Sequence, residues 1–152
     1  MFPKSLENDR VKILVTGGSG FLGRHLVSAL EKAGYEDIVV FNRKPCEDLR
    51  SKHVSVIYGD LQDAEAVEKA MAGCDAVFHV AAKAGVWGPY SEYYRINVVG
   101  TQNVLQACLK HNVRYLVYTS SPSVVFNGQS LVNVSEKVGY GNPRKMCAYA
   151  KT

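Results

Sequence analysis

Three glycines recur at a fixed spacing where an apolar run gives way to an amphipathic segment. Gly17, Gly20 and Gly23 are each separated by two residues. In such a pattern the first glycine allows a tight turn, the second lets a pyrophosphate approach the backbone, and the third lets a helix pack closely on a sheet. The free N–H groups at the start of that helix attract phosphate oxygens. The pattern predicts dinucleotide binding, and an ordinary glycine-rich turn is the alternative.

A basic pair follows the second apolar run of the chain. Folds that bind NAD usually place an acidic residue there to hold the ribose diol. This chain has Asn42, Arg43 and Lys44 instead. Arg43 and Lys44 could pair with a 2′-phosphate, which favours NADP over NAD. The alternative is a solvated basic turn with NAD bound by Asn42.

Alternating elements must position these groups. Short apolar runs predict five strands, at 11–15, 38–41, 54–58, 75–80 and 115–119. Helical spacing and end signals predict helices at 21–33, between Asp63 and Gly73, and at 91–110. Residues 122–143 are rich in Gly, Ser and Asn, and are expected to form a loop or lid. The apolar strands predict an α/β fold, a doubly wound Rossmann-type parallel sheet in the order 3-2-1-4-5.

Length, charge and cysteine content argue against several classes of function. A chain of 152 residues is expected to form one domain, at 11–152, after a polar segment at 1–10 that lacks the apolar core of a signal peptide. The net charge of +4 comes without a long basic run, which argues against nucleic-acid binding. The four cysteines are far apart, so neither a metal site nor disulfides are expected. No apolar run is long enough to span a bilayer, and a cytoplasmic protein is expected.

The ordered motifs resemble those of the extended short-chain dehydrogenase/reductase family. The fingerprint is Thr16–Gly23, and the further matching stations, in chain order, are Gly59–Leu61, His79–Ala82, Asn97–Thr101, Tyr118–Ser121 and Tyr149. The resemblance covers residues 11–152, about the first half of a typical member. Within the family, Ala81–Gly88 and Thr119–Phe126 look most like the 3β-hydroxysteroid dehydrogenase-like branch. That branch includes bacterial members that reduce long-chain β-keto acids or act on sterol-like substrates.

The resemblance implies three catalytic residues. Tyr149 would be the general acid and base, assisted by nearby positive charge. Ser121 would hydrogen-bond the substrate oxygen, and Asn97 would support the proton relay. The alternatives are an ordinary tyrosine, a serine that ends a strand and an amide on a helix surface.

The glycine pattern, the basic pair and the resemblance together assign a set of residues to the dinucleotide. Within it, Asp60 would bond the adenine amine, with a turn or cap role as its alternative, and the small residues after the fourth strand would line the cofactor. The full set is Gly17, Gly20, Phe21, Leu22, Gly23, Asn42, Arg43, Asp60, Leu61, Ala81, Ala82, Lys83 and Thr119.

The family also carries a lysine four residues after its catalytic tyrosine, which here would directly follow Thr152. Lys151 cannot replace it, because two residues along a helix turn a side chain to the opposite side. The substrate-binding part and the last strands of the family would also lie beyond residue 152. We therefore expect the 152-residue polypeptide to bind nucleotide weakly or to fold poorly, and to turn over little.

The sequence predicts an NAD(P)-dependent oxidoreductase that moves a hydride between nicotinamide and a hydrophobic 3-hydroxy or 3-keto substrate. One alternative is a nucleotide-sugar epimerase or dehydratase, which shares the same nucleotide half. Another is a non-catalytic NADP(H)-binding sensor or scaffold. Helix pairs across a dimer are common in the family, so the helix at 91–110 is the candidate face for a homodimer.

Overall fold

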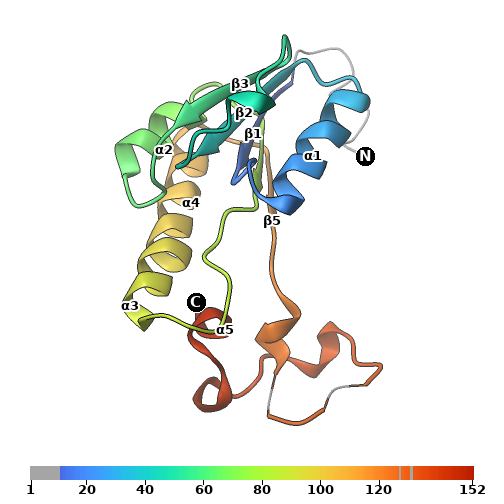
Figure 1. Cartoon of the computed structure of the whole chain (residues 1–152), viewed down its shortest axis with the longest axis vertical. Coiled ribbons are helices and arrows are strands. Elements are labelled where there is room, and N and C mark those ends of the chain that lie inside the picture. Colours follow the sequence, from blue (N-terminus) through green and yellow to red (C-terminus); the bar gives the residue numbers. More distant parts are fainter. Residues whose placement is uncertain (1–10, 127, 131) are drawn as a thin grey trace.

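A five-stranded sheet forms the centre of the protein. The computed structural model describes residues 11–126, 128–130 and 132–152, so the polar segment at 1–10 lies outside the described residues. All pairings are parallel and the order is β3-β2-β1-β4-β5, which confirms the predicted doubly wound topology (Figure 1). The strands are β1 (Lys12–Thr16), β2 (Asp37–Asn42), β3 (Val54–Tyr58), β4 (Ala76–His79) and β5 (Tyr115–Tyr118).

Helices cover both faces of this sheet. Helix α1 (Phe21–Lys32) lies on one face, and α2 (Ala64–Met71) and α4 (Gly100–Lys110) lie on the other (Figure 1). Successive residues of β1 enter different cores, since Ile13 packs in the α1 cluster and Leu14 in the α2–α4 cluster. Because both faces are buried, the central strands are apolar throughout rather than alternating.

The helix ends follow the signals in the sequence. Gly34 has φ +89°, the left-handed conformation that ends α1. At the start of α2, the Asp63 carboxylate accepts the backbone N–H groups of Glu65 and Ala66, both at 3.1 Å. The first of these ends lies in the connection from α1 to β2, and the second in the connection from β3 to α2.

The helix predicted at 91–110 is interrupted. It consists of α3 (Tyr90–Tyr93), a π-helical segment η3 (Tyr94–Val99) and then α4. A π-helix adds one residue per turn, which re-aims the side chains that it carries, and such segments are frequent at functional sites. The predicted helix is therefore present, and the π-helical geometry of residues 94–99 is what its apolar spacing did not predict.

Strand β5 is one of the two outer strands of the sheet in the described part of the chain, and β3 is the other. Leu116, Val117 and Tyr118 are exposed. Beyond β5 the backbone forms the short turns η4 (Pro122–Val125), η5 (Glu136–Val138) and η6 (Pro143–Lys145), then the helical turn α5 (Ala148–Lys151), and η2 (Glu47–Leu49) joins β2 to β3. Nowhere in the described residues does a helix combine the length and apolarity needed to cross a membrane.

Candidate dinucleotide and catalytic site

The glycine turn closes the carboxyl end of β1, and two of the three glycines in the pattern leave no room for a side chain. Gly17 has φ +71°, and a Cβ there would lie 2.8 Å from the Cα of Ala81. A Cβ on Gly23 would lie 2.2 Å from the carbonyl oxygen of Gly17. Both positions therefore require glycine for the fold itself, because α1 and the loop after β4 pack directly against the turn.

The middle glycine differs from the other two. Gly20 has φ −73°, and the nearest atom to a Cβ there would be the Gly17 carbonyl oxygen, at 3.3 Å. It is the N-cap of α1, with no side-chain cap and no acidic residue in the first turn. The N-terminal amides of a 12-residue helix are thus open to an anion.

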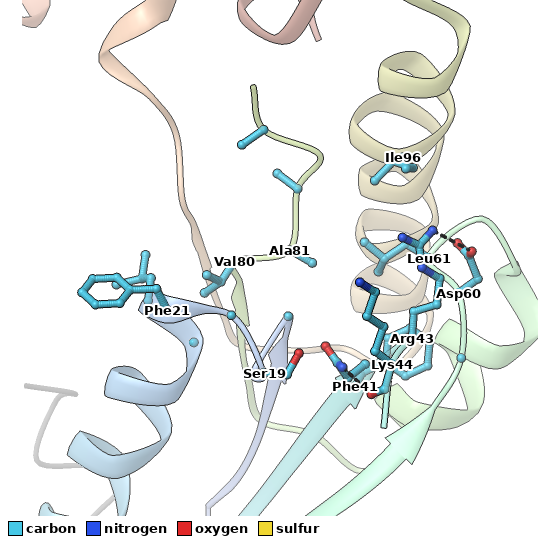
Figure 2. A pocket seen from close by; sticks show the side chains of 18 of the residues that line it. Ser19, Phe21, Phe41, Arg43, Lys44, Asp60, Leu61, Val80, Ala81 and Ile96 are labelled. Carbon is cyan, nitrogen blue, oxygen red and sulfur yellow. Dashed lines mark hydrogen bonds and ion pairs between the residues drawn. The ribbon is translucent and has the colours of Figure 1, made fainter. Parts of the chain in front are cut away.

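A cavity of about 390 Å³ opens over this turn, at the carboxyl ends of the strands. Figure 2 shows Phe21 and Val80 on one side of it and Arg43, Lys44 and Asp60 on the other. Of the residues assigned to the dinucleotide, it is lined by Gly17, Gly20, Phe21, Leu22, Gly23, Asn42, Arg43, Asp60, Leu61, Ala81 and Ala82. The fold therefore gathers eleven of the thirteen assigned residues around one cavity.

An ion pair stands at the basic side of the cavity. Arg43 Nη1 lies 3.6 Å from Asp60 Oδ2, and both side chains are partly exposed (Figure 2). The backbone and side-chain amides of Gln62 also donate to Asp60 Oδ1, at 3.0 and 3.2 Å. Burial raises the pKa of Asp60, but these hydrogen bonds and the Arg43 charge outweigh it and hold the pKa below its usual value.

The Asn42 amide is occupied by the turn itself. Asn42 is buried, and its Nδ2 donates to the carbonyl oxygen of Lys44 at 2.6 Å. This bond closes a turn directly after β2 and thereby positions Arg43 and Lys44. Asn42 lines the cavity, but its amide acts chiefly on the basic turn.

A second cavity, of about 450 Å³, contains the three residues assigned to catalysis. Asn97, Ser121 and Tyr149 all line it, and so does Thr119. Ala82 and Tyr149 line both cavities, so the two spaces adjoin at these residues. A ligand that fills the first cavity can therefore reach the hydroxyl-lined second one past Tyr149.

The hydroxyls of the two catalytic candidates Ser121 and Tyr149 are held differently. Ser121 is the N-cap of η4, where its Oγ accepts the Ser123 N–H at 3.2 Å and donates to Ser123 Oγ at 3.1 Å. The Tyr149 hydroxyl has no hydrogen-bond partner among residues 11–126, 128–130 and 132–152. Tyr149 thus leaves its phenol oxygen available to a ligand, whereas Ser121 also serves the local turn.

Asn97 joins three segments of the chain. It is 5% exposed, so a helix-surface amide is the wrong interpretation. Its Oδ1 accepts the Lys83 N–H at 2.8 Å, and its Nδ2 donates to the Lys83 carbonyl at 3.1 Å and to Thr152 Oγ1 at 3.0 Å. Both amide hydrogens are used, so the side chain acts by positioning the loop after β4 and the end of α5.

Lys83 and Thr119 lie outside the lining of the first cavity. Lys83 Nζ pairs with Glu92 Oε2 at 3.0 Å and lies 5.0 Å from the centroid of the Tyr93 ring. Its side chain thereby fastens the loop after β4 to α3. Thr119 lines the second cavity, on the side of the catalytic candidates.

Sequence reasoning missed several lining residues. Ile96 reaches the first cavity from the π-helical segment, where regular helical spacing gave no reason to expect it. Tyr140, Pro143 and Met146 reach the second cavity from the irregular stretch after η4. No periodicity exists there to show which side chains face inward. Across the described residues no three metal-ligating side chains gather.

The chain matches one family profile over nearly its whole length. The profile of the 3-beta hydroxysteroid dehydrogenase/isomerase family covers residues 14–152. The chain belongs to this family. It is 47% identical over 133 residues to the 2-alkyl-3-oxoalkanoate reductase of Stenotrophomonas maltophilia, covering 86% of this chain and 40% of that protein. It is 38% identical to the 3-beta-hydroxysteroid dehydrogenase of Mycolicibacterium neoaurum, covering 90% of this chain and 39% of that one.

Solved structures agree with this membership. A short-chain dehydrogenase/reductase superfamily protein from Agrobacterium tumefaciens with bound NAD superposes with a TM-score of 0.78 at 30% identity, covering 91% of this chain and 40% of that one. The Thermus thermophilus UDP-glucose 4-epimerase complex with NAD gives a TM-score of 0.78 at 28% identity, covering 92% of this chain and 46% of that one. The chain thus spans about 40% of the length of the curated relatives it matches.

Proposed function

We propose that this chain is the dinucleotide-binding half of an NADP(H)-dependent oxidoreductase that interconverts a hydrophobic 3-hydroxy and 3-keto compound. The observation that carries the proposal is that the two cavities adjoin at Ala82 and Tyr149. A dinucleotide seated on the glycine turn then extends toward the hydroxyls that would handle the substrate oxygen.

The residues of the first cavity suit a dinucleotide. The open amides at the start of α1 would bind the pyrophosphate, with Gly20 giving it close access. Arg43 and Lys44 would meet the adenosine end, where a 2′-phosphate could replace Asp60 as the partner of Arg43. This basic turn, with no acidic residue at the end of β2, supports NADP(H) over NAD(H).

The residues of the second cavity would move the proton. Nicotinamide, when bound, supplies the hydride carrier. Tyr149 would give its phenol proton to the substrate oxygen in reduction and take it back in oxidation. The Ser121 hydroxyl, now donating to Ser123 Oγ, needs only to rotate to donate to the same oxygen. Asn97 would hold the loop after β4 and Thr152 in place around them.

The substrate class is supported by the relatives and by the cavity. One relative is named a 2-alkyl-3-oxoalkanoate reductase and another a 3-beta-hydroxysteroid dehydrogenase, so both names carry an oxygen function at a third carbon. Val124, Pro143 and Met146 contribute apolar surface beside the hydroxyls of the second cavity. The same cavity is also lined by polar side chains, so it suits a compound that places an apolar part on the first group and an oxygen on the second.

A nucleotide-sugar epimerase is the second candidate, because the Thermus thermophilus UDP-glucose 4-epimerase shares the fold over 92% of this chain. The identity of 47% to the Stenotrophomonas maltophilia reductase, against 28% to that epimerase, favours the reductase instead. A non-catalytic NADP(H)-binding sensor would bind the cofactor and turn over nothing.

A chimera tests the proposal. Residues 11–152 are joined to the part of the Stenotrophomonas maltophilia reductase that follows its matched region, and NADPH-dependent reduction of a 2-alkyl-3-oxoalkanoate is measured. We expect turnover, and a fall in kcat of roughly 100-fold or more in Tyr149→Phe with unchanged NADPH affinity. Tyr90→Phe, which lines neither cavity, is the matched control. Full activity in Tyr149→Phe would exclude the assigned role, and NADPH binding without turnover would favour the sensor.

A further inference from the structure

A chain of hydrogen bonds lies at the end of the sheet, beneath the two cavities, and neither proposed site makes use of it. Thr16 ends β1 and is 0% exposed, and His79 ends β4 and is 1% exposed. Thr16 Oγ1 lies 2.7 Å from His79 Nδ1, and His79 Nε2 lies 2.9 Å from Thr101 Oγ1 on α4. Three separate elements are thus joined through one imidazole.

The hydrogens of this chain can be assigned by counting. The backbone N–H groups of Val80 and Ala81 both donate to Thr16 Oγ1, at 3.2 Å each. A hydroxyl oxygen has two lone pairs, so these bonds fill them and the hydroxyl hydrogen is left for His79 Nδ1. Nδ1 is then the acceptor, and Nε2 carries the ring proton and donates it to Thr101. An imidazolium would bring a third donor to the Thr16 oxygen, so the ring is neutral.

The surroundings of His79 also favour a neutral ring. Burial lowers the pKa of His79 to about 4, which keeps the ring uncharged near neutrality. The ring of Tyr118 on β5 packs against it, with 5.6 Å between the ring centroids. Figure 2 shows Val80 and Ala81, the residues that follow His79, above the glycine turn.

The bonds to Thr16 fix the spacing of the two backbone segments that face the dinucleotide. The Ala81 backbone lies against Gly17 so closely that a Cβ on Gly17 would come within 2.8 Å of it. Ala82, the next residue, lines both cavities. A change in the Thr16 bonds would therefore move the loop that separates the glycine turn from the catalytic hydroxyls.

We propose that His79 is a positioning residue, held neutral in the Nε2–H tautomer, which through Thr16 fixes residues 80–82 against the glycine turn for dinucleotide binding. The binding part of this inference rests on the proposed function, whereas the tautomer does not. His79 touches neither substrate nor cofactor in this role.

The first test reads the tautomer directly, without a dinucleotide. ¹⁵N NMR of the histidine rings in the complete chain is recorded from about pH 8 to about pH 5. We expect His79 to show an Nε2–H tautomer throughout this range. An Nδ1–H tautomer, or protonation of the ring within the range, would overturn the proposal whether or not the chain binds NADP(H).

The second test separates positioning from stability. Thr16→Ser keeps the hydroxyl and Thr16→Val removes it, and NADPH dissociation constants are measured where circular dichroism shows each variant to be folded. We expect native affinity in Thr16→Ser and about tenfold weaker binding in Thr16→Val. A merely structural role would lower the unfolding midpoint and leave the affinity of the folded chain unchanged, and equal affinities would overturn the proposal. If Thr16→Val does not fold, His79→Asn and His79→Gln replace it.

These two variants each retain one of the imidazole bonds. In His79→Asn the short side-chain amide would sit near the former Nδ1 and keep a partner for Thr16. In His79→Gln the longer amide would sit near the former Nε2 and keep a partner for Thr101. We expect His79→Asn to bind NADPH more tightly than His79→Gln. The reverse order would place the positioning role on α4 instead of on Thr16 and would overturn the proposal.

Discussion

At the scale of single residues, the three glycines of the turn carry different demands. Gly23 is required by the fold, because a Cβ would lie 2.2 Å from the Gly17 carbonyl oxygen. Gly20 has an ordinary φ of −73°, and a Cβ there would lie 3.3 Å from the Gly17 carbonyl oxygen, so a methyl group needs only a small shift of the turn. The spacing in the sequence could not show which of these two glycines the fold requires, since the residue type is the same at both positions.

This difference gives a matched pair of substitutions. We expect Gly20→Ala to lower the unfolding midpoint only slightly and to weaken NADPH binding by about tenfold or more, because the methyl group would stand where the pyrophosphate approaches. We expect Gly23→Ala to lower the midpoint sharply, through a backbone clash. Thermal unfolding and NADPH titration of both variants check this. Native affinity in a folded Gly20→Ala would show that the phosphates do not approach this position.

Arg43 gives the test of cofactor choice. Asp60 already pairs with Arg43 at 3.6 Å, so a 2′-phosphate would exchange one anionic partner for another. We expect Arg43→Gln to weaken NADPH binding by roughly tenfold and to leave NADH binding within about twofold, since charge-assisted hydrogen bonds to the phosphate are lost. Titration with both dinucleotides measures the ratio, and Lys32→Gln at the far end of α1 is the matched control for charge. An equal loss for the two dinucleotides would assign Arg43 to a part that they share.

At the scale of elements, the strands and their order follow from the sequence with little ambiguity. The apolar runs of β1, β2 and β4 are buried on both faces, and right-handed crossovers leave few possible orders for the sheet. The π-helical segment η3 within the helix at 91–110 could not be predicted from the sequence, because tertiary contacts favour such a segment. There, the buried Asn97 amide binds the Lys83 backbone, and Gly100 packs against Leu61. These contacts cannot be read from periodicity.

The residues of the candidate site also differ in whether local structure or tertiary contacts determine their positions. The glycine turn and the basic turn are local structures, so their residues could be assigned to one cavity from sequence pattern alone. The position of Lys83 depends on its pairing with Glu92, which a motif does not encode. The contributions of Tyr140 and Met146 depend on an irregular backbone that carries no period. His79 lies within the strand predicted at 75–80, and only the register of β1 against β4 shows that it faces Thr16.

The link between β1 and β4 through His79 predicts a pH dependence of stability. The pKa of His79 falls from 6.5 to about 4 on folding. Below about pH 6.5 the His79 ring is therefore protonated in the unfolded chain while it stays neutral in the folded chain. The free energy of unfolding is fully retained above about pH 6.5 and decreases as the pH falls toward about 4, by up to about 3 kcal/mol. Urea unfolding between these pH values measures the slope.

His79→Gln is the control for this slope, because it removes the titrating group and leaves the carboxylates. The hydrogen bond from Arg114 lowers the pKa of Asp75. Carboxylates of this kind lose their contribution to the free energy of unfolding mainly at lower pH. We therefore expect a flatter pH profile for His79→Gln between about pH 6.5 and about pH 4.5. An unchanged slope in this variant would mean that other groups cause the loss.

At the scale of the whole molecule, one edge of the sheet stands out. On the described part of the chain β5 is paired only with β4, and Val117 and Tyr118 are 46% and 51% exposed. Unpaired N–H and C=O groups on an apolar edge strand invite pairing with another chain. The helix face of α4 offers a second apolar candidate, since Leu109 is 73% exposed. Sedimentation can decide between these two surfaces.

We expect the 152-residue polypeptide to self-associate through β5, and Val117→Lys to shift it toward monomer, because a lysine on an edge strand opposes pairing with another edge. Leu109→Lys makes the same chemical change on α4 and is the matched control. Analytical ultracentrifugation of the native chain and both variants, with unfolding midpoints measured beside it, shows which surface associates. If Leu109→Lys alone gives monomer, the helix face is the interface, as a family-type homodimer would require. Loss of association in Val117→Lys alone would instead show that two copies associate through the edge of the sheet at β5.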